Sequence, residues 1–197
     1  PPTAMSPLTG SPGTSVPAND DAGGDVAFGG GAFAASAFGA ASAAFQVDLS
    51  HVSTDTMRSA LDVSKAPIIM THSNAYAVCQ SNRNVPDDVI RRVGENGGVI
   101  CATFVPLYLA NSYIQFSDEY DAEEARVKGL WHDEPQRVRK HMEDWEAKHP
   151  RPVTTEKDVA DHIDYFVKVA GIDHVGIGAD FGGFRTPVKN LEGVDQY

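Results

Sequence analysis

Short apolar runs alternate with helix-forming segments from Gln46 onward, and this alternation constrains the fold more than any other feature of the sequence. We expect strands at 47–49, 68–70, 99–104 and 174–178, with helices between them at about 54–63, 86–97 and 155–171. Runs that are apolar throughout are typical of strands covered on both faces. Strands that alternate with helices are typical of a parallel sheet. The pattern therefore predicts an α/β fold built on a parallel sheet.

Residues that begin and end helices support these boundaries. Ser53 and Thr155 carry hydroxyls that can cap a helix, and an acidic residue follows Thr155 three positions later, as in a capping box. Pro86 suits the first turn of a helix, and Gly171 suits a helix end. Three helices of the pattern therefore have a local signal for at least one boundary.

Residues 1–46 differ in composition from the rest of the chain. They contain no Lys, Arg, Glu or His, and consist mainly of Gly, Ala, Ser and Pro with scattered Phe. Such a segment has too few side chains to bury a core, so we expect a disordered low-complexity tail over 1–46 and one folded domain over 47–197.

Charge narrows the classes of partner. The formal net charge is −11, which argues against a nucleic acid or an anionic membrane as partner. The segment 112–152 is polar, and we expect one exposed helix in it, at 136–148. Its basic run at 137–140 is flanked by acidic residues and is therefore interpreted as a solvated helix face.

Cysteine content and hydropathy indicate the compartment. Cys79 and Cys101 are too few for a disulfide framework, so we expect buried free thiols in a reducing environment. The sequence has no run of about 18 apolar residues and no basic segment before an apolar one at its start. We therefore expect a soluble, cytoplasmic protein without a transmembrane segment.

Polar residues follow several of the predicted strands. His51, His72, Tyr108 and Asp180 all fall at or just beyond a strand end. The carboxyl ends of parallel strands share one edge of a sheet, and two histidines on neighbouring strands would lie roughly 5 Å apart, which suits ligands of one metal ion. A strand-end histidine can equally be structural, and Asp180 can be an ordinary loop carboxylate. The spacing alone leaves these alternatives open.

A set of short sequence blocks carries a resemblance to a known family. In chain order the blocks are Asp48-Leu49-Ser50-His51-Val52-Ser53, Thr71-His72-Ser73-Asn74-Ala75, Arg83-Asn84-Val85-Pro86-Asp87-Asp88, Asp161-His162-Ile163-Asp164 and Val175-Gly176-Ile177-Gly178-Ala179-Asp180-Phe181. Together they resemble the signature blocks of the zinc-dependent membrane (renal) dipeptidases, peptidase family M19. The resemblance covers 47–197.

The resemblance implies a fold, a metal and roles for five residues. The fold would be a TIM-type (β/α)8 barrel, and a complete site would bind two Zn²⁺ ions and hydrolyse dipeptides. His51 and His72 would ligate one zinc, and Arg83 would bind the substrate carboxylate. Asp180 would bind the substrate amino group or transfer a proton, and Tyr108 would line the pocket. Family members commonly form homodimers, so a homodimer is implied as well.

The sequence departs from the family in its first half. The family also uses a His-x-Asp pair, a Glu that bridges both zinc ions and a further histidine, all upstream of the position of His51. Here no His precedes His51 and no Glu precedes Glu95. A complete barrel needs roughly 250 residues, so we expect a partial barrel, at most one partial zinc site and little activity of the chain alone. Two alternatives remain: a non-catalytic remnant that acts as a binding module, and a sibling hydrolase that cleaves another amide.

Overall fold

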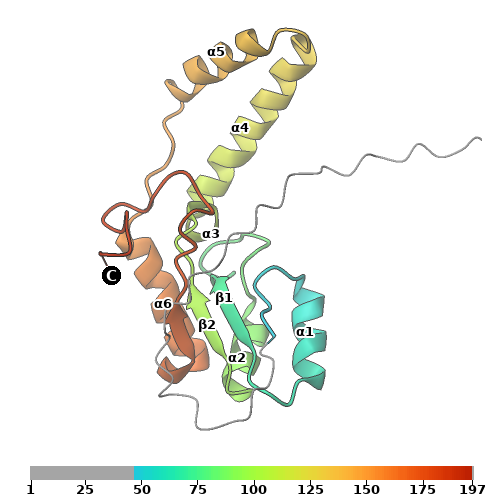
Figure 1. Cartoon of the computed structure of the whole chain (residues 1–197), viewed down its shortest axis with the longest axis vertical. Coiled ribbons are helices and arrows are strands. Elements are labelled where there is room, and N and C mark those ends of the chain that lie inside the picture. The colour runs from blue at the N-terminus through green and yellow to red at the C-terminus, as the bar shows by residue number, and fades with distance from the viewer. Residues whose placement is uncertain (1–46, 197) are drawn as a thin grey trace, which may run out of the picture. The chain divides into compact units, whose positions relative to one another are not determined.

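The computed structural model describes residues 47–196, and the predicted tail over 1–46 lies outside the described residues (Figure 1). These residues form a mixed α/β structure with one small parallel sheet. The elements are α1 (Thr54–Val63), β1 (Ile69–Ser73), α2 (Asp87–Glu95), β2 (Val99–Ala102), α3 (Pro106–Leu109), α4 (Asn111–Leu130), α5 (Pro135–Glu146), α6 (Glu156–Ala170), the 3-10 helix η1 (Ile172–His174) and β3 (Val175–Ile177).

The sheet confirms the predicted parallel arrangement. Its strand order is β1-β2-β3, with Ile69 opposite Val99 and Ile100 opposite Val175. The predicted strand at 47–49 is reduced to a single parallel bridge between Asp48 and Ile69. The predicted strand at 99–104 ends at Ala102, because the chain then turns into the short helix α3.

Helix boundaries follow the local signals closely. The Ser53 hydroxyl accepts a hydrogen bond from the Thr56 N–H at the start of α1. Thr155 and Asp158 form the predicted capping box of α6, and Gly171 ends that helix with φ = 98°. Because each signal acts within a few residues, sequence alone can locate these boundaries.

The main core lies between the sheet and the helices that pack on it. Helices α2 and α6 approach closely at Gly94, where a Cβ atom would lie 2.7 Å from the Ala170 carbonyl oxygen. The two cysteines lie in this part of the chain as buried free thiols, as predicted. Burial raises the pKa of the Cys101 thiol to about 11 and also raises that of Cys79. The main core contains Leu49, Met57, Leu61, Ile68, Met70, Ala75, Val85, Val89, Ile90, Val93, Ile100, Ala102 and Phe166.

The polar segment contains a helix that the sequence did not predict. Helix α4 spans 20 residues, and α5, which packs beside it, confirms the predicted helix at 136–148 to within two residues at each end (Figure 1). Only Phe116 and Val127 of α4 are buried, too few to produce a visible apolar period. The prediction that 137–140 is a solvated face holds except at Val138, which is buried against α4.

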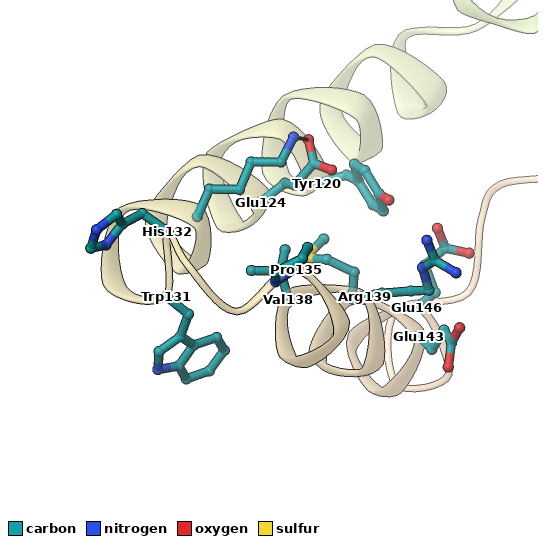
Figure 2. A pocket seen from close by; sticks show the side chains of 11 residues that line it. Tyr120, Glu124, Trp131, His132, Pro135, Val138, Arg139, Glu143 and Glu146 are labelled. Carbon is teal, nitrogen blue, oxygen red and sulfur yellow. Dashed lines mark ion pairs between the residues drawn. The ribbon is translucent and has the colours of Figure 1, made fainter.

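A cavity of about 620 Å³ lies between α4 and α5. Figure 2 shows side chains of both helices around it, with Tyr120 from α4 and Val138 from α5. Trp131 and Met142 add further apolar surface. None of the five predicted site residues lines this cavity.

Among the described residues, no helix is long and apolar enough to cross a membrane.

The chain just beyond β3 approaches β1 closely. At Gly178, one residue after β3, a Cβ atom would lie 1.7 Å from the Thr71 carbonyl oxygen of β1 and 3.0 Å from Cβ of Cys101 in β2. The strands β1 and β3 are separated by β2, so the chain bends toward β1 as it leaves β3. Glycine is needed here because any side chain would meet backbone atoms.

Candidate functional site

The two histidines predicted as metal ligands lie in contact at the end of the sheet. The Nε2 atoms of His51 and His72 are 2.6 Å apart, and the ring centroids are 4.7 Å apart. His51 follows the Asp48 bridge to β1, and His72 is the fourth residue of β1. Neighbouring backbone positions therefore bring together two side chains that are 21 residues apart in sequence.

Asp48 organises the backbone and side chains around the pair. Its carboxylate accepts hydrogen bonds from the Ser50 N–H, the Ser50 hydroxyl and the Thr71 hydroxyl, at 2.9, 2.6 and 2.6 Å. Burial alone would raise the pKa of Asp48, but these hydrogen bonds outweigh burial and the pKa is lowered. The Thr71 hydroxyl lies 2.8 Å from Nδ1 of His72, and the Ser50 hydroxyl accepts from the His72 N–H. His72 is thus held through both its ring and its backbone.

Arg83 faces this site as a cation without an anionic partner. Its Nη1 donates to the Tyr108 hydroxyl at 2.9 Å, and its Nη2 donates to the Ser50 carbonyl at 2.9 Å. The guanidinium also lies 4.9 Å from the centre of the Tyr108 ring. In the part of the chain that the structure describes, Arg83 forms no ion pair, and its buried Nε has no hydrogen-bond partner. A guanidinium whose hydrogen-bond partners are all neutral is suited to bind a carboxylate.

Buried side chains from the segment between β1 and α2 and from α6 hold the short helix that carries Tyr108. The Tyr108 carbonyl accepts from the side-chain amides of Asn74 and Asn84, at 3.3 and 2.8 Å. The next carbonyl, that of Leu109, lies 3.2 Å from Nε2 of His162. Nδ1 of His162 accepts from the Ala75 N–H at 3.0 Å, so the ring carries its proton on Nε2 and donates it to Leu109. Burial lowers the pKa of His162 and keeps this neutral form.

Asp180 completes the group from the third strand. It lies just beyond β3 with φ = 61°, in the left-handed region. Gly183 packs against its side chain, since a Cβ atom at Gly183 would lie 2.7 Å from Oδ2 of Asp180. The pKa of His51 is lowered by burial first and then by the charges of Arg83 and His72, while Asp180 opposes the shift. Among the predicted residues, His51 contacts His72 and Arg83 contacts Tyr108, whereas Asp180 acts on His51 through its charge.

The donor set fits part of a zinc site. The Nε2 atoms of His51 and His72 face each other in a hydrogen-bond contact, and imidazole nitrogen is a common ligand of Zn²⁺. A zinc ion needs at least three protein ligands in a catalytic site. Within 47–196, no group of three or more His, Cys, Asp or Glu side chains could hold a metal ion. The residues present therefore fit half of a metal site.

Sequence reasoning missed the residues that support the site. Asp48, Thr71, Asn74, Asn84 and His162 all lie in the conspicuous sequence blocks, but nothing in their spacing indicated what they contact. His162 sits on the buried face of α6, where its position resembles that of any core residue. Only their place in the blocks could have drawn attention to them.

Comparison with known proteins gives a consistent result. Residues 44–197 match the family described as Membrane dipeptidase (Peptidase family M19). Dipeptidase C965.12 of Schizosaccharomyces pombe is 38% identical over 151 residues, and dipeptidase tcpJ of Claviceps purpurea is 36% identical over the same length. Each alignment covers 77% of this chain and 27% of the relative. The chain thus spans about a quarter of the length of these relatives.

Solved structures show the same relationship. The probable dipeptidase PvdM from Pseudomonas aeruginosa aligns with a TM-score of 0.54 and 28% identity, covering 70% of this chain and 38% of that one. A metallopeptidase from Rhodobacter sphaeroides, solved with a phosphinate mimic of the dipeptide L-Ala-D-Ala, aligns with a TM-score of 0.51 and 25% identity. That alignment covers 74% of this chain and 31% of the other.

Proposed function

The chain belongs to the membrane dipeptidase family, peptidase family M19, and on that premise we propose that it carries part of the active site of a zinc-dependent dipeptidase. One observation carries the proposal. The Nε2 atoms of His51 and His72 converge beside Arg83, a cation with no carboxylate partner among the described residues. This arrangement combines a partial metal site with a binding point for the carboxyl end of a short peptide.

Each of the five residues has a role in this proposal. His51 and His72 would hold zinc through Nε2, and bound zinc supplies polarisation of a carbonyl and a more acidic water molecule. Arg83 would bind the substrate carboxylate through its guanidinium, with Tyr108 holding that group in place. Asp180 would bind the substrate amino group or accept a proton, since it follows β3 and its charge acts on His51.

The proposal extends to the fold. The parallel order of the strands and the contact of Gly178 with Thr71 support a strongly curved sheet, as in a segment of a (β/α)8 barrel. The sequence offers no His before His51 and no Glu before Glu95. We therefore expect the chain alone to bind at most one zinc ion, weakly, and to hydrolyse dipeptides slowly.

Zinc binding by the purified full chain tests the metal site. Calorimetric titration should show no more than one zinc ion per chain, and either His51→Ala or His72→Ala should abolish binding. His132→Ala is a matched control, because the His132 side chain is 78% exposed and pairs only with Asp133. Zinc binding that persists in His51→Ala and in His72→Ala would refute the site. Two bound zinc ions with rapid dipeptide hydrolysis would refute the expectation of weak activity.

Substrate profiling separates the proposed activity from its alternatives. The solved relative with a bound L-Ala-D-Ala mimic makes a D-residue at the second position the first comparison. Hydrolysis of L-Ala-D-Ala but not L-Ala-L-Ala would favour the sibling activity. Binding of either dipeptide without any hydrolysis would favour a non-catalytic binding module.

A further inference from the structure

We infer that Asp48 and Thr71 are positioning residues that fix the tautomer of His72, so that its Nε2 presents a lone pair to the metal. The inference rests on the proposed zinc site, but the positions of the protons follow from the contacts of Asp48, Thr71 and His72 alone. These contacts form a chain from the Asp48 carboxylate through the Thr71 hydroxyl to Nδ1 of His72.

The direction of the first hydrogen bond is determined by its acceptor. Oδ2 of Asp48 lies 2.6 Å from Oγ1 of Thr71, and an ionised carboxylate can only accept. The single hydroxyl proton of Thr71 is therefore donated to Asp48. If Thr71 instead donated to His72, two oxygens with lone pairs would face each other at 2.6 Å without a proton between them.

The second hydrogen bond then has only one possible donor. Thr71 has no proton left for the contact at 2.8 Å with Nδ1 of His72, so Nδ1 must carry the proton and donate it. Ser50 cannot change this result, because it donates its own hydroxyl proton to Oδ1 of Asp48 at 2.6 Å. In the neutral ring of His72, a proton on Nδ1 leaves a lone pair on Nε2.

This tautomer has a consequence for His51. With a lone pair on Nε2 of His72, the proton in the 2.6 Å contact between the two Nε2 atoms belongs to His51. His72 thus already has its lone pair on Nε2, where it accepts the His51 proton, and this hydrogen bond must open before a metal can take its place. His51 must move its Nε2 proton to Nδ1 or release it before it can become a ligand.

We call the hydrogen bonds from Asp48 through Thr71 to His72 the relay. An Asp48→Asn substitution should reverse the direction of both bonds. Oδ1 of Asp48 accepts from three donors, the Ser50 N–H, the Ser50 hydroxyl and the Thr71 N–H. An amide oxygen would keep that position, so the amide nitrogen would face Oγ1 of Thr71 and donate to it. Thr71 would then donate to Nδ1 of His72, and the ring proton would move to Nε2. The lone pair would be lost from the atom that faces the metal.

The experiment measures the tautomer and zinc affinity separately in the full chain. Proton–nitrogen correlation spectra of chain labelled with ¹⁵N-histidine, at about pH 8 where histidine is neutral, identify which ring nitrogen carries the proton. His72→Ala assigns the signals. We expect Nδ1–H in the wild type and Nε2–H in Asp48→Asn, with zinc affinity about 10- to 100-fold lower in the variant. Thr71→Val should weaken zinc binding similarly, whereas Thr71→Ser, which keeps the hydroxyl, should bind zinc like the wild type.

The outcomes distinguish the relay from the zinc proposal. A wild type that binds no zinc, with the tautomers as expected, refutes the zinc site and supports the relay. An Nδ1–H signal for His72 in Asp48→Asn overturns the relay, whatever the zinc affinity. Thermal unfolding shows whether each variant is folded. If Asp48→Asn does not fold, the test is the zinc affinity of Thr71→Val compared with that of Thr71→Ser. Equal zinc affinity of these two variants overturns the relay.

Discussion

Removal of the His162 side chain should destabilise the whole described domain. The ring is fully buried and makes two hydrogen bonds, from the Ala75 N–H and to the Leu109 carbonyl. His162→Ala leaves both backbone groups buried without a partner, at a cost of about 1–3 kcal/mol each. A cavity in place of the ring adds to this cost. We expect the free energy of unfolding to fall by about 4 kcal/mol.

Urea unfolding followed by circular dichroism measures this loss. His162→Gln is the informative second variant, because a Gln side chain can both accept and donate and should retain part of the stability. His132→Ala serves as the control, since that ring is 78% exposed. A loss below about 1 kcal/mol in His162→Ala, or a loss equal to that of His132→Ala, would refute the assigned hydrogen bonds.

The pH dependence of stability provides a second test of the same residue. Burial lowers the pKa of His162 in the folded chain from its ordinary value of 6.5, whereas hydrogen bonding to Leu109 and the charges of Asp158 and Asp161 oppose the shift. The unfolded chain therefore binds a proton at a higher pH than the folded chain does. Stability is complete above about pH 6.5 and falls as pH decreases, by at most about 1.4 kcal/mol per pH unit for one group. His51, whose pKa is also lowered, acts in the same direction but is present in both proteins. Equal pH dependence in the wild type and His162→Gln would contradict this account.

Three further predictions concern single side chains. Gly178→Ala should destabilise the chain by about 3 kcal/mol in urea unfolding, because its Cβ would lie 1.7 Å from a backbone oxygen, whereas Gly129→Ala has open space and should be neutral or stabilising. Cys101, with a pKa of about 11, and the buried Cys79 should react with a thiol reagent at pH 8 only after unfolding, and rapid labelling of the native chain would contradict their burial. Arg83→Met should weaken binding of a dipeptide by about tenfold or more without changing zinc affinity, and unchanged dipeptide affinity would exclude the carboxylate contact.

The parts of the fold that sequence predicted are those with local signals. Helices α1 and α6 begin at hydroxyl caps that act within three residues, and the strands are apolar runs. Helix α4 was missed because it buries only Phe116 and Val127 along 20 residues. The first strand shrinks to one bridge, because only Asp48 pairs in register with β1.

The site likewise contains features that the sequence predicted and features that it could not predict. The proximity of His51 and His72 follows from neighbouring strands of a parallel sheet, so their positions alone predicted it. The contact of Arg83 with Tyr108 depends on the loop before α2 and on the four-residue helix α3, and no periodicity describes either of them. The roles of Asp48 and Thr71 depend on individual rotamers and on which atom holds each proton, and neither can be inferred from spacing.

The hydrogen bond between the Ala75 N–H and His162 also determines when the site can form during folding. The hydrogen bond joins residues that are 87 positions apart, and contacts of such separation form slowly because a long loop must close first. A nascent chain can pair β1 with β2 soon after both are made, but α3 and Tyr108 gain their full support only after α6 has been synthesised and has docked. Assembly of the site around Arg83 is therefore a late event in folding, and a refolding experiment should recover helical content before it recovers dipeptide binding.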